Sequence, residues 1–162
     1  MNTTVQIWCV WCGPVAIALY VLAFGPIAGY LPPHPPSMSP EAVAAFYETN
    51  RTGVRFGQLL GLILSAFLFP WFAVISVQMA RIEGRFPVLS VVQFGGGTLL
   101  IVFFQICSMM WIIAAFRPEL DATTVRVLHD GSWLIFVMVF PCYVLQMISM
   151  CIVGLMDKDP EP

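Results

Sequence analysis

The sequence predicts an all-α integral membrane protein, a single domain of residues 1–162 built as a bundle of four transmembrane helices with short amphipathic loop helices. Of its residues 59% are hydrophobic and 10% are charged, whereas soluble domains average about 25% charged residues. No charge interrupts the stretch between Arg55 and Arg81, or the one between Arg85 and Arg117. Each exceeds the roughly 20 apolar residues that a helix needs to cross a bilayer. Because only a short turn joins them, the two helices are expected to lie antiparallel and side by side.

The overall charge excludes some classes of partner. The formal net charge is −2, which leaves no basic surface for nucleic acid and no polybasic segment for anionic lipid. The lipid bilayer is therefore the expected surrounding of most of the surface. The five cysteines lie in apolar stretches rather than in loops, so they do not form the disulfide framework of a secreted domain.

The first span is expected over residues 6–30. It has no positively charged segment before it and is too long for the apolar region of a signal peptide, and it contains Gly13-Pro14 and Gly25-Pro26. We therefore interpret it as a retained transmembrane helix with a kink near Pro14, rather than as a cleaved signal.

Residues 31–51 are expected to form a loop outside the membrane. The prolines between Pro32 and Pro36 exclude a helix there, because proline lacks an amide donor. Ser39-Pro40-Glu41 then predicts a helix start with a hydroxyl N-cap. Val43, Phe46 and Tyr47 share one face, so this short helix is expected at the interface or across the end of the bundle. A solvated loop helix is the alternative.

The remaining spans are expected over residues 54–80, 88–116 and 132–156. Pro70 is expected to bend the second span. The third is longer than a 30 Å hydrocarbon slab requires, so it should tilt or project. Between the last two spans, Asp121 is expected to cap a short helix that leads to Asp130-Gly131.

An even number of spans places both termini on one side. Three basic residues, Arg81, Arg85 and Lys158, would share that side, against four on the other, so the positive-inside rule decides nothing. We favour cytoplasmic termini because the two longer loops, which contain prolines and acidic residues, resemble loops on the outer side of the membrane.

No Asp, Glu, Lys, Arg or His lies deep in any span. Proton pumps and ion-coupled carriers depend on such groups, because only these stabilise or move charge inside the bilayer. The sequence therefore argues against both functions.

The spans carry mild polar residues at helical spacings instead. They are Gln58, Ser65 and Ser76 on the second, Gln93, Gly97, Gln105 and Ser108 on the third, and Cys142, Gln146 and Ser149 on the fourth. Two interpretations stay open. The stripes form hydrogen bonds between packed helices, or they line a seam for a bound lipid, quinone or sterol. Apart from such a ligand, no cofactor is predicted.

Gly57, Gly61 and Ser65 form a ladder of small residues that allows a neighbouring helix to approach closely. Together with the uncharged spans and the short loops, this ladder motivates our first hypothesis of function. In that hypothesis the protein is a non-catalytic accessory or scaffold subunit, which docks on other membrane subunits or self-associates. The hydrophobic-ligand binder is the alternative.

Cys9-Val-Trp-Cys12 matches the pattern of a redox-active cysteine pair. Four spans with this pair resemble the plan of the DsbB and VKOR thiol oxidoreductases, and the resemblance implies a quinone-linked thiol oxidoreductase as a second alternative. Those families also carry a second cysteine pair in an extramembrane loop, which both loops here lack.

His34 and His129 are expected on the same side of the membrane, with Asp130 beside the second. A histidine and carboxylate cluster could hold a metal ion or serve as an acid–base pair. The spacing is not typical of metal ligands, so no metal site is predicted and solvated loop residues are the alternative.

Several stretches together resemble a group of small multi-pass bacterial membrane proteins, common in actinobacteria, that have no assigned activity. These stretches are residues 31–37 (LPPHPPS), 41–47 (EAVAAFY), 75–85 (ISVQMARIEGR) and 115–119 (AFRPE). The resemblance implies a location in the bacterial inner membrane and no catalytic residues. Members of the group are longer, with further spans beyond the point where this chain ends.

Overall fold

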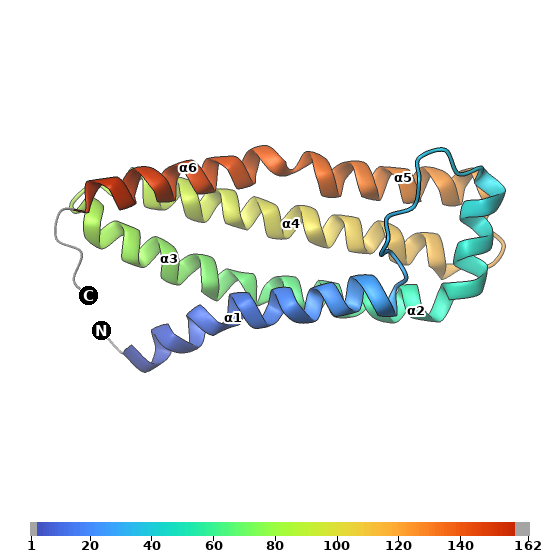
Figure 1. Ribbon diagram of the computed structural model, residues 1–162, viewed down its shortest axis with the longest axis horizontal. Helices are drawn as coiled ribbons and strands as arrows, with labels where there is room; N and C mark the ends of the chain where they lie inside the picture. Colours follow the sequence, from blue (N-terminus) through green and yellow to red (C-terminus); the bar gives the residue numbers. More distant parts are fainter. Residues whose placement is uncertain (1–2, 158–162) are drawn as a thin grey trace.

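The computed structural model describes residues 3–157, and this part of the chain contains helices and their connections without strands. Its elements are α1 (Thr3–Leu22), the π-helix η1 (Ala23–Ile27), α2 (Pro40–Ala66), α3 (Leu68–Glu83), α4 (Val88–Phe116), α5 (Ala122–Met138) and α6 (Phe140–Met156). They form an elongated bundle (Figure 1). The start of α1, the α3–α4 turn and the end of α6 lie at one end, and the loops before α2 and α5 lie at the other.

The prediction of an all-α bundle with four spans is confirmed. Four helical segments are long and apolar enough to cross a membrane, namely Thr3–Ile27, Pro40–Glu83, Val88–Phe116 and Ala122–Met156. Helix α4 is central, since it packs against α2, α3, α5 and α6. Its 29 residues extend about 43 Å at about 1.5 Å per residue, so the bundle is longer than the hydrocarbon layer is thick.

Prolines explain the breaks inside two of these spans. The second span is interrupted at Phe67, in the turn before Pro70, where a bend was predicted. Proline supplies no amide hydrogen to the preceding turn, so the helical ladder is interrupted there. The fourth span is interrupted in the same way at Val139, two residues before Pro141, although a continuous helix was predicted. Helix α1 continues through Pro14, and the wider π-turn of η1 contains Pro26.

The start of α2 covers one end of the bundle. The Ser39 hydroxyl accepts a hydrogen bond from the backbone N–H of Ala42 at 3.2 Å, as an N-cap should. Residues 40–49, here called the cap segment, run across the bundle before non-helical angles at Asn50 turn the chain along it (Figure 1). Val43 and Tyr47 are buried. Of the two positions predicted for this helix, it therefore occupies the one across the bundle end.

Helix α5 begins where the sequence predicts but extends further than expected. The Asp121 carboxylate accepts a hydrogen bond from the N–H of Thr124 at 3.0 Å, which confirms the predicted N-cap. The helix does not end at Gly131, however, but continues to Met138. A Cβ at Gly131 would lie 2.9 Å from the Met110 side chain of α4. Gly131 therefore serves the packing of α5 on α4 rather than a helix end.

Candidate functional site

Two cavities lie in one cleft between α1 and α6, across the face of α3. We call it the α1–α6 cleft. It arises because α1 packs on α2, η1 and α3, and α6 packs on α3 and α4, while α1 and α6 are not packed together. Two chambers that share Ile75 and Met150 make up the cleft. An opening between two transmembrane helices faces lipid, so molecules dissolved in the bilayer can reach it.

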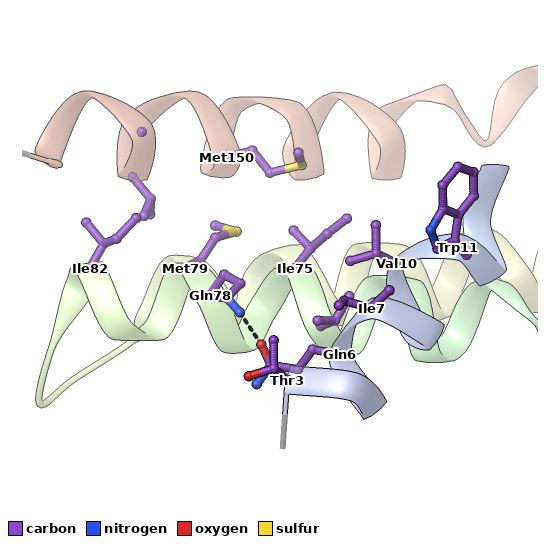
Figure 2. Close-up of a pocket in the computed structure, with 13 residues that line it drawn as sticks. Thr3, Gln6, Ile7, Val10, Trp11, Ile75, Gln78, Met79, Ile82 and Met150 are labelled. Atoms are coloured by element: carbon purple, nitrogen blue, oxygen red, sulfur yellow. Dashed lines mark hydrogen bonds between the residues drawn. The ribbon is translucent and has the colours of Figure 1, made fainter. Parts of the chain in front are cut away.

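We call the chamber near the start of α1 and the end of α3 the lower chamber, and the other the upper chamber. The lower chamber has a volume of about 600 Å³. Its walls are mainly the apolar side chains of Ile7, Val10, Ile75, Met79, Ile82 and Met150, which face one another across the opening in Figure 2. Its mouth is polar. Gln78 Nε2 donates to Gln6 Oε1 at 2.7 Å, and Arg81 Nη1 donates to Gln78 Oε1 at 2.9 Å. This chain of hydrogen bonds connects α1 to α3.

The upper chamber has a volume of about 510 Å³ and lies deeper in the bundle. Aromatic side chains form much of its wall, namely Trp71, Phe72, Phe104, Phe136, Phe140 and Tyr143. Gly13 on α1 makes room for Trp71, since a Cβ there would clash with the indole ring. A smaller cavity of about 180 Å³ shares Ile17, Leu68, Phe104 and Phe136 with this chamber and extends it toward Tyr20.

Two glutamines place polar atoms in this apolar wall. Gln146 is 3% exposed, and its Nε2 donates to the backbone carbonyl of Gln93 at 3.2 Å. Gln93 is fully buried, and its Oε1 accepts a hydrogen bond from Ser76 Oγ. The Gln93 Nε2 has no hydrogen-bond partner in the described part of the chain. A buried amide donor without a partner costs about 1–3 kcal/mol, and this one belongs to a residue that borders the upper chamber.

The predicted polar seam is divided between two places. Gln93 and Gln146 line the upper chamber. Gln58 and Ser108 instead lie around Gly61, where a Cβ would be 3.8 Å from Gln58 Oε1 and 3.4 Å from Ser108 Oγ. Both are buried with side-chain polar atoms that lack partners among residues 3–157.

The other two predicted seam residues contribute to neither chamber. Gln105 is half-buried and Ser149 is buried, and neither lines a wall. The Ser149 hydroxyl donates to the carbonyl of Leu145 on its own helix at 2.8 Å. Of the six residues predicted for the seam, Gln93 and Gln146 therefore border the upper chamber.

The small-residue ladder on α2 packs against other helices of the same chain. A Cβ at Gly57 would lie 2.5 Å from the carbonyl oxygen of Ala23, and one at Gly61 would lie 3.2 Å from the Tyr20 ring. Ser65 is buried, with its hydroxyl donating to Leu62. This face of α2 therefore packs against η1 and α1, and a partner protein cannot dock on it without displacing them.

The paired cysteines lie inside a helix. Cys9 and Cys12 are free thiols, both half-buried. The helix dipole acts most strongly in the first turn of a helix. Helix α1 begins at Thr3, so both cysteines lie beyond that turn. The other cysteines are on α4 and α6, and all are free as well.

The two histidines lie close together at the capped end, 5.4 Å apart between ring centroids. Tyr47 Oη is 3.0 Å from His129 Nδ1 and Tyr30 Oη is 3.1 Å from Tyr47 Oη, all buried. Because His129 is 3% exposed, it is a core residue of α5 rather than a solvated loop residue. The described residues contain no group of three His, Cys, Asp or Glu side chains that could hold a metal ion.

Comparison of the chain with protein-family models, with curated proteins and with solved structures finds no match. The function must therefore be inferred from the residues that line the cavities. The described residues that line the two chambers of the cleft include no Asp, Glu, Lys, Arg or His. Such walls can bind and orient an apolar molecule, whereas moving a proton or a metal ion needs ionisable groups.

Proposed function

We propose that the protein binds a membrane-soluble molecule in the α1–α6 cleft. The ligand has a mainly apolar body and carries an uncharged hydrogen-bond acceptor, such as the carbonyl of a quinone, the hydroxyl of a sterol or the ester of a lipid. The observation that carries this proposal is the apolar upper chamber, which is bordered by Gln93, a buried residue whose Nε2 has no hydrogen-bond partner among residues 3–157.

The size of the cleft supports the same proposal. Binding sites for small molecules typically have volumes of about 300–1,000 Å³ and mostly apolar walls with few polar groups. The chambers, at about 600 and 510 Å³, are in this range. A saturated hydrocarbon chain would fill the space but leave the Gln93 amide without an acceptor, so a ligand with an acceptor is favoured.

The depth of Gln93 suggests how the ligand lies. Gln93 is five residues from Val88, where α4 begins, which corresponds to about 8 Å along the helix axis. An acceptor at that depth lies near the membrane surface at this end of the bundle. The apolar body would then extend toward Phe104 and Phe136, deeper in the upper chamber.

The experiment is purification in a mild detergent, followed by extraction and mass spectrometry of the small molecules that remain bound. We expect a defined molecule at near-stoichiometric amounts, and about five- to tenfold less of it after Gln93→Met, because one hydrogen bond is lost while side-chain volume is kept. Gln105→Met is the matched control, since it removes the same group from the same helix outside both chambers. Equal retention by all three proteins, or no retained molecule in any of them, would overturn the proposal.

The accessory-subunit hypothesis remains the second candidate, and the same purification tests it. In this hypothesis the cleft is covered by an apolar helix of a partner. A stoichiometric membrane protein that copurifies in place of a small molecule would support it. The thiol oxidoreductase hypothesis needs thiol–quinone exchange by the purified protein, and Cys12→Ser would have to abolish that exchange.

For location, we propose the bacterial inner membrane with both termini in the cytoplasm. Reporter fusions at the C-terminus and within the 31–39 loop test this orientation. Activity of a periplasm-dependent reporter at the C-terminus, with none in the loop, would reverse it.

A further inference from the structure

A separate cavity of about 260 Å³ lies at the capped end of the bundle, outside the α1–α6 cleft. The proline loop and the cap segment form one side, and the middle of α5 forms the other. Its lining includes His34, Pro36, Val43, His129, Asp130 and Trp133. At about 30 Å³ per water molecule, this space would hold several waters or one small organic molecule.

The hydrogen bonds behind the cavity determine where His129 carries its proton. Tyr47 is the hydrogen-bond partner of Tyr30, and both hydroxyls are buried. For each hydroxyl hydrogen to be used, Tyr30 must donate to Tyr47, and Tyr47 must donate to His129 Nδ1. A neutral imidazole that accepts at Nδ1 carries its hydrogen on Nε2. His129 therefore offers Nε2–H as a free donor in the wall of the cavity.

Two further polar groups line the same cavity. The Trp133 indole Nε1 is buried and has no partner in the described part of the chain. Asp130 lies next to His129 with a half-exposed side chain, and its Oδ2 accepts a hydrogen bond from Arg126 Nε at 3.3 Å. The cavity thus combines the N–H groups of His129 and Trp133, the imidazole of His34 and one carboxylate, between the apolar side chains of Pro36, Met38 and Leu134.

We propose that this cavity binds a small amine that carries an oxygen acceptor, the chemistry of an amino alcohol. The oxygen accepts from His129 Nε2–H and Trp133 Nε1–H, and the ammonium group pairs with the Asp130 carboxylate. A simple anion would meet the carboxylate, and a simple amine would leave both donors without a partner. This chemistry is found in free ethanolamine and in an ethanolamine lipid head group. The inference is independent of the proposed function, since the two cavities share no lining residue.

The test is a titration of the full chain in a maltoside detergent, followed through the indole ¹⁵N–H signals, with Trp133→Phe identifying the relevant one. The probes are ethanolamine and a short-chain phosphatidylethanolamine, with ethylamine and acetate as controls. We expect saturable shifts of the Trp133 signal with ethanolamine or its lipid form, and about tenfold weaker binding of ethylamine, which lacks the acceptor. Saturation by free ethanolamine supports a water-soluble ligand, and saturation by the lipid alone supports a head group.

Two variants make the test specific. Asp130→Asn should weaken ethanolamine binding about tenfold or more, because a charge-assisted contact is lost. Glu119→Gln is the control, since it removes an equal charge from an exposed position at the same end of the bundle. The absence of any saturable shift, or equal affinity of the Asp130→Asn and Glu119→Gln proteins, would overturn the proposal.

Discussion

Tyr47 on the cap segment and His129 on α5 are joined by a buried hydrogen bond of 3.0 Å between residues 82 positions apart in the chain. Tyr30, at the end of the first span, continues this network through the Tyr47 hydroxyl at 3.1 Å. The network therefore connects three separate segments at the capped end. It also orients the imidazole toward the adjoining cavity.

Tyr47→Phe should destabilise the protein by about 1–3 kcal/mol, because the buried His129 Nδ1 and Tyr30 hydroxyl then lose the hydrogen bonds that they make to the Tyr47 hydroxyl. Thermal unfolding in detergent measures this as a lower Tm. Tyr143→Phe is the control, since the Tyr143 side chain is exposed on α6, and it should leave Tm nearly unchanged. Equal Tm values for the two variants would contradict the role given to the Tyr47 bond.

His34 should make stability depend on pH. Burial lowers its pKa in the fold below the usual value near 6.5, so the unfolded chain binds a proton more readily. Stability should therefore fall as pH drops through about 6.5 and level off below the folded pKa. The titratable groups near His34 are His129 and Tyr30, with ring centroids 5.4 and 6.0 Å from its own, and Asp130 in the same cavity.

Because these groups also titrate, the measurement is a comparison. Tm is followed from pH 8 to pH 5 for the natural protein and for His34→Gln. The variant should show a shallower decline across this range. Identical slopes would show that burial of His34 in the loop does not contribute to the pH dependence.

Two glycine substitutions should act in opposite directions. Gly57→Ala places a methyl group 2.5 Å from the Ala23 carbonyl oxygen, so the helices must separate, at a cost of about 1–3 kcal/mol. Gly95→Ala adds a methyl group that meets nothing within 4 Å. It should stabilise α4 by about 0.5–1 kcal/mol, because alanine loses less backbone entropy on helix formation. Thermal unfolding of both variants measures these changes. Equal Tm values for Gly57→Ala and Gly95→Ala would contradict the close packing assigned to Gly57.

Glu83 should control the start of α4. Its carboxylate accepts hydrogen bonds from the backbone N–H groups of Leu89 at 2.9 Å and Ser90 at 2.7 Å. These are donors of a helix N-terminus that no intrahelical partner satisfies. Glu83→Ala should therefore cost about 0.5–2 kcal/mol, similar to other lost N-caps, and increase amide exchange at these two residues. The exposed Glu48→Ala change should do neither.

The sequence alone was sufficient for the number of spans and for the local helix starts. Uncharged stretches of this length have to be helical in a bilayer, since each backbone group must find its partner within the segment. The N-caps at Ser39 and Asp121 bond to residues three positions further along the chain, so the sequence pattern alone predicts them. The continuation of α5 past Gly131 could not be predicted from the sequence, because this glycine makes room for the side chain of Met110 on another helix.

Tertiary structure decided which polar residues meet. Gln93 and Gln105 look like members of one stripe, but twelve residues at about 100° each place them about 120° apart around α4. Only Gln93 reaches the chamber wall. His34 and His129 likewise share a cavity because the cap segment and the proline loop lie against the middle of α5. Helix formation depends on near neighbours and solvent, whereas a site depends on how helices rotate and pack, which no local pattern records.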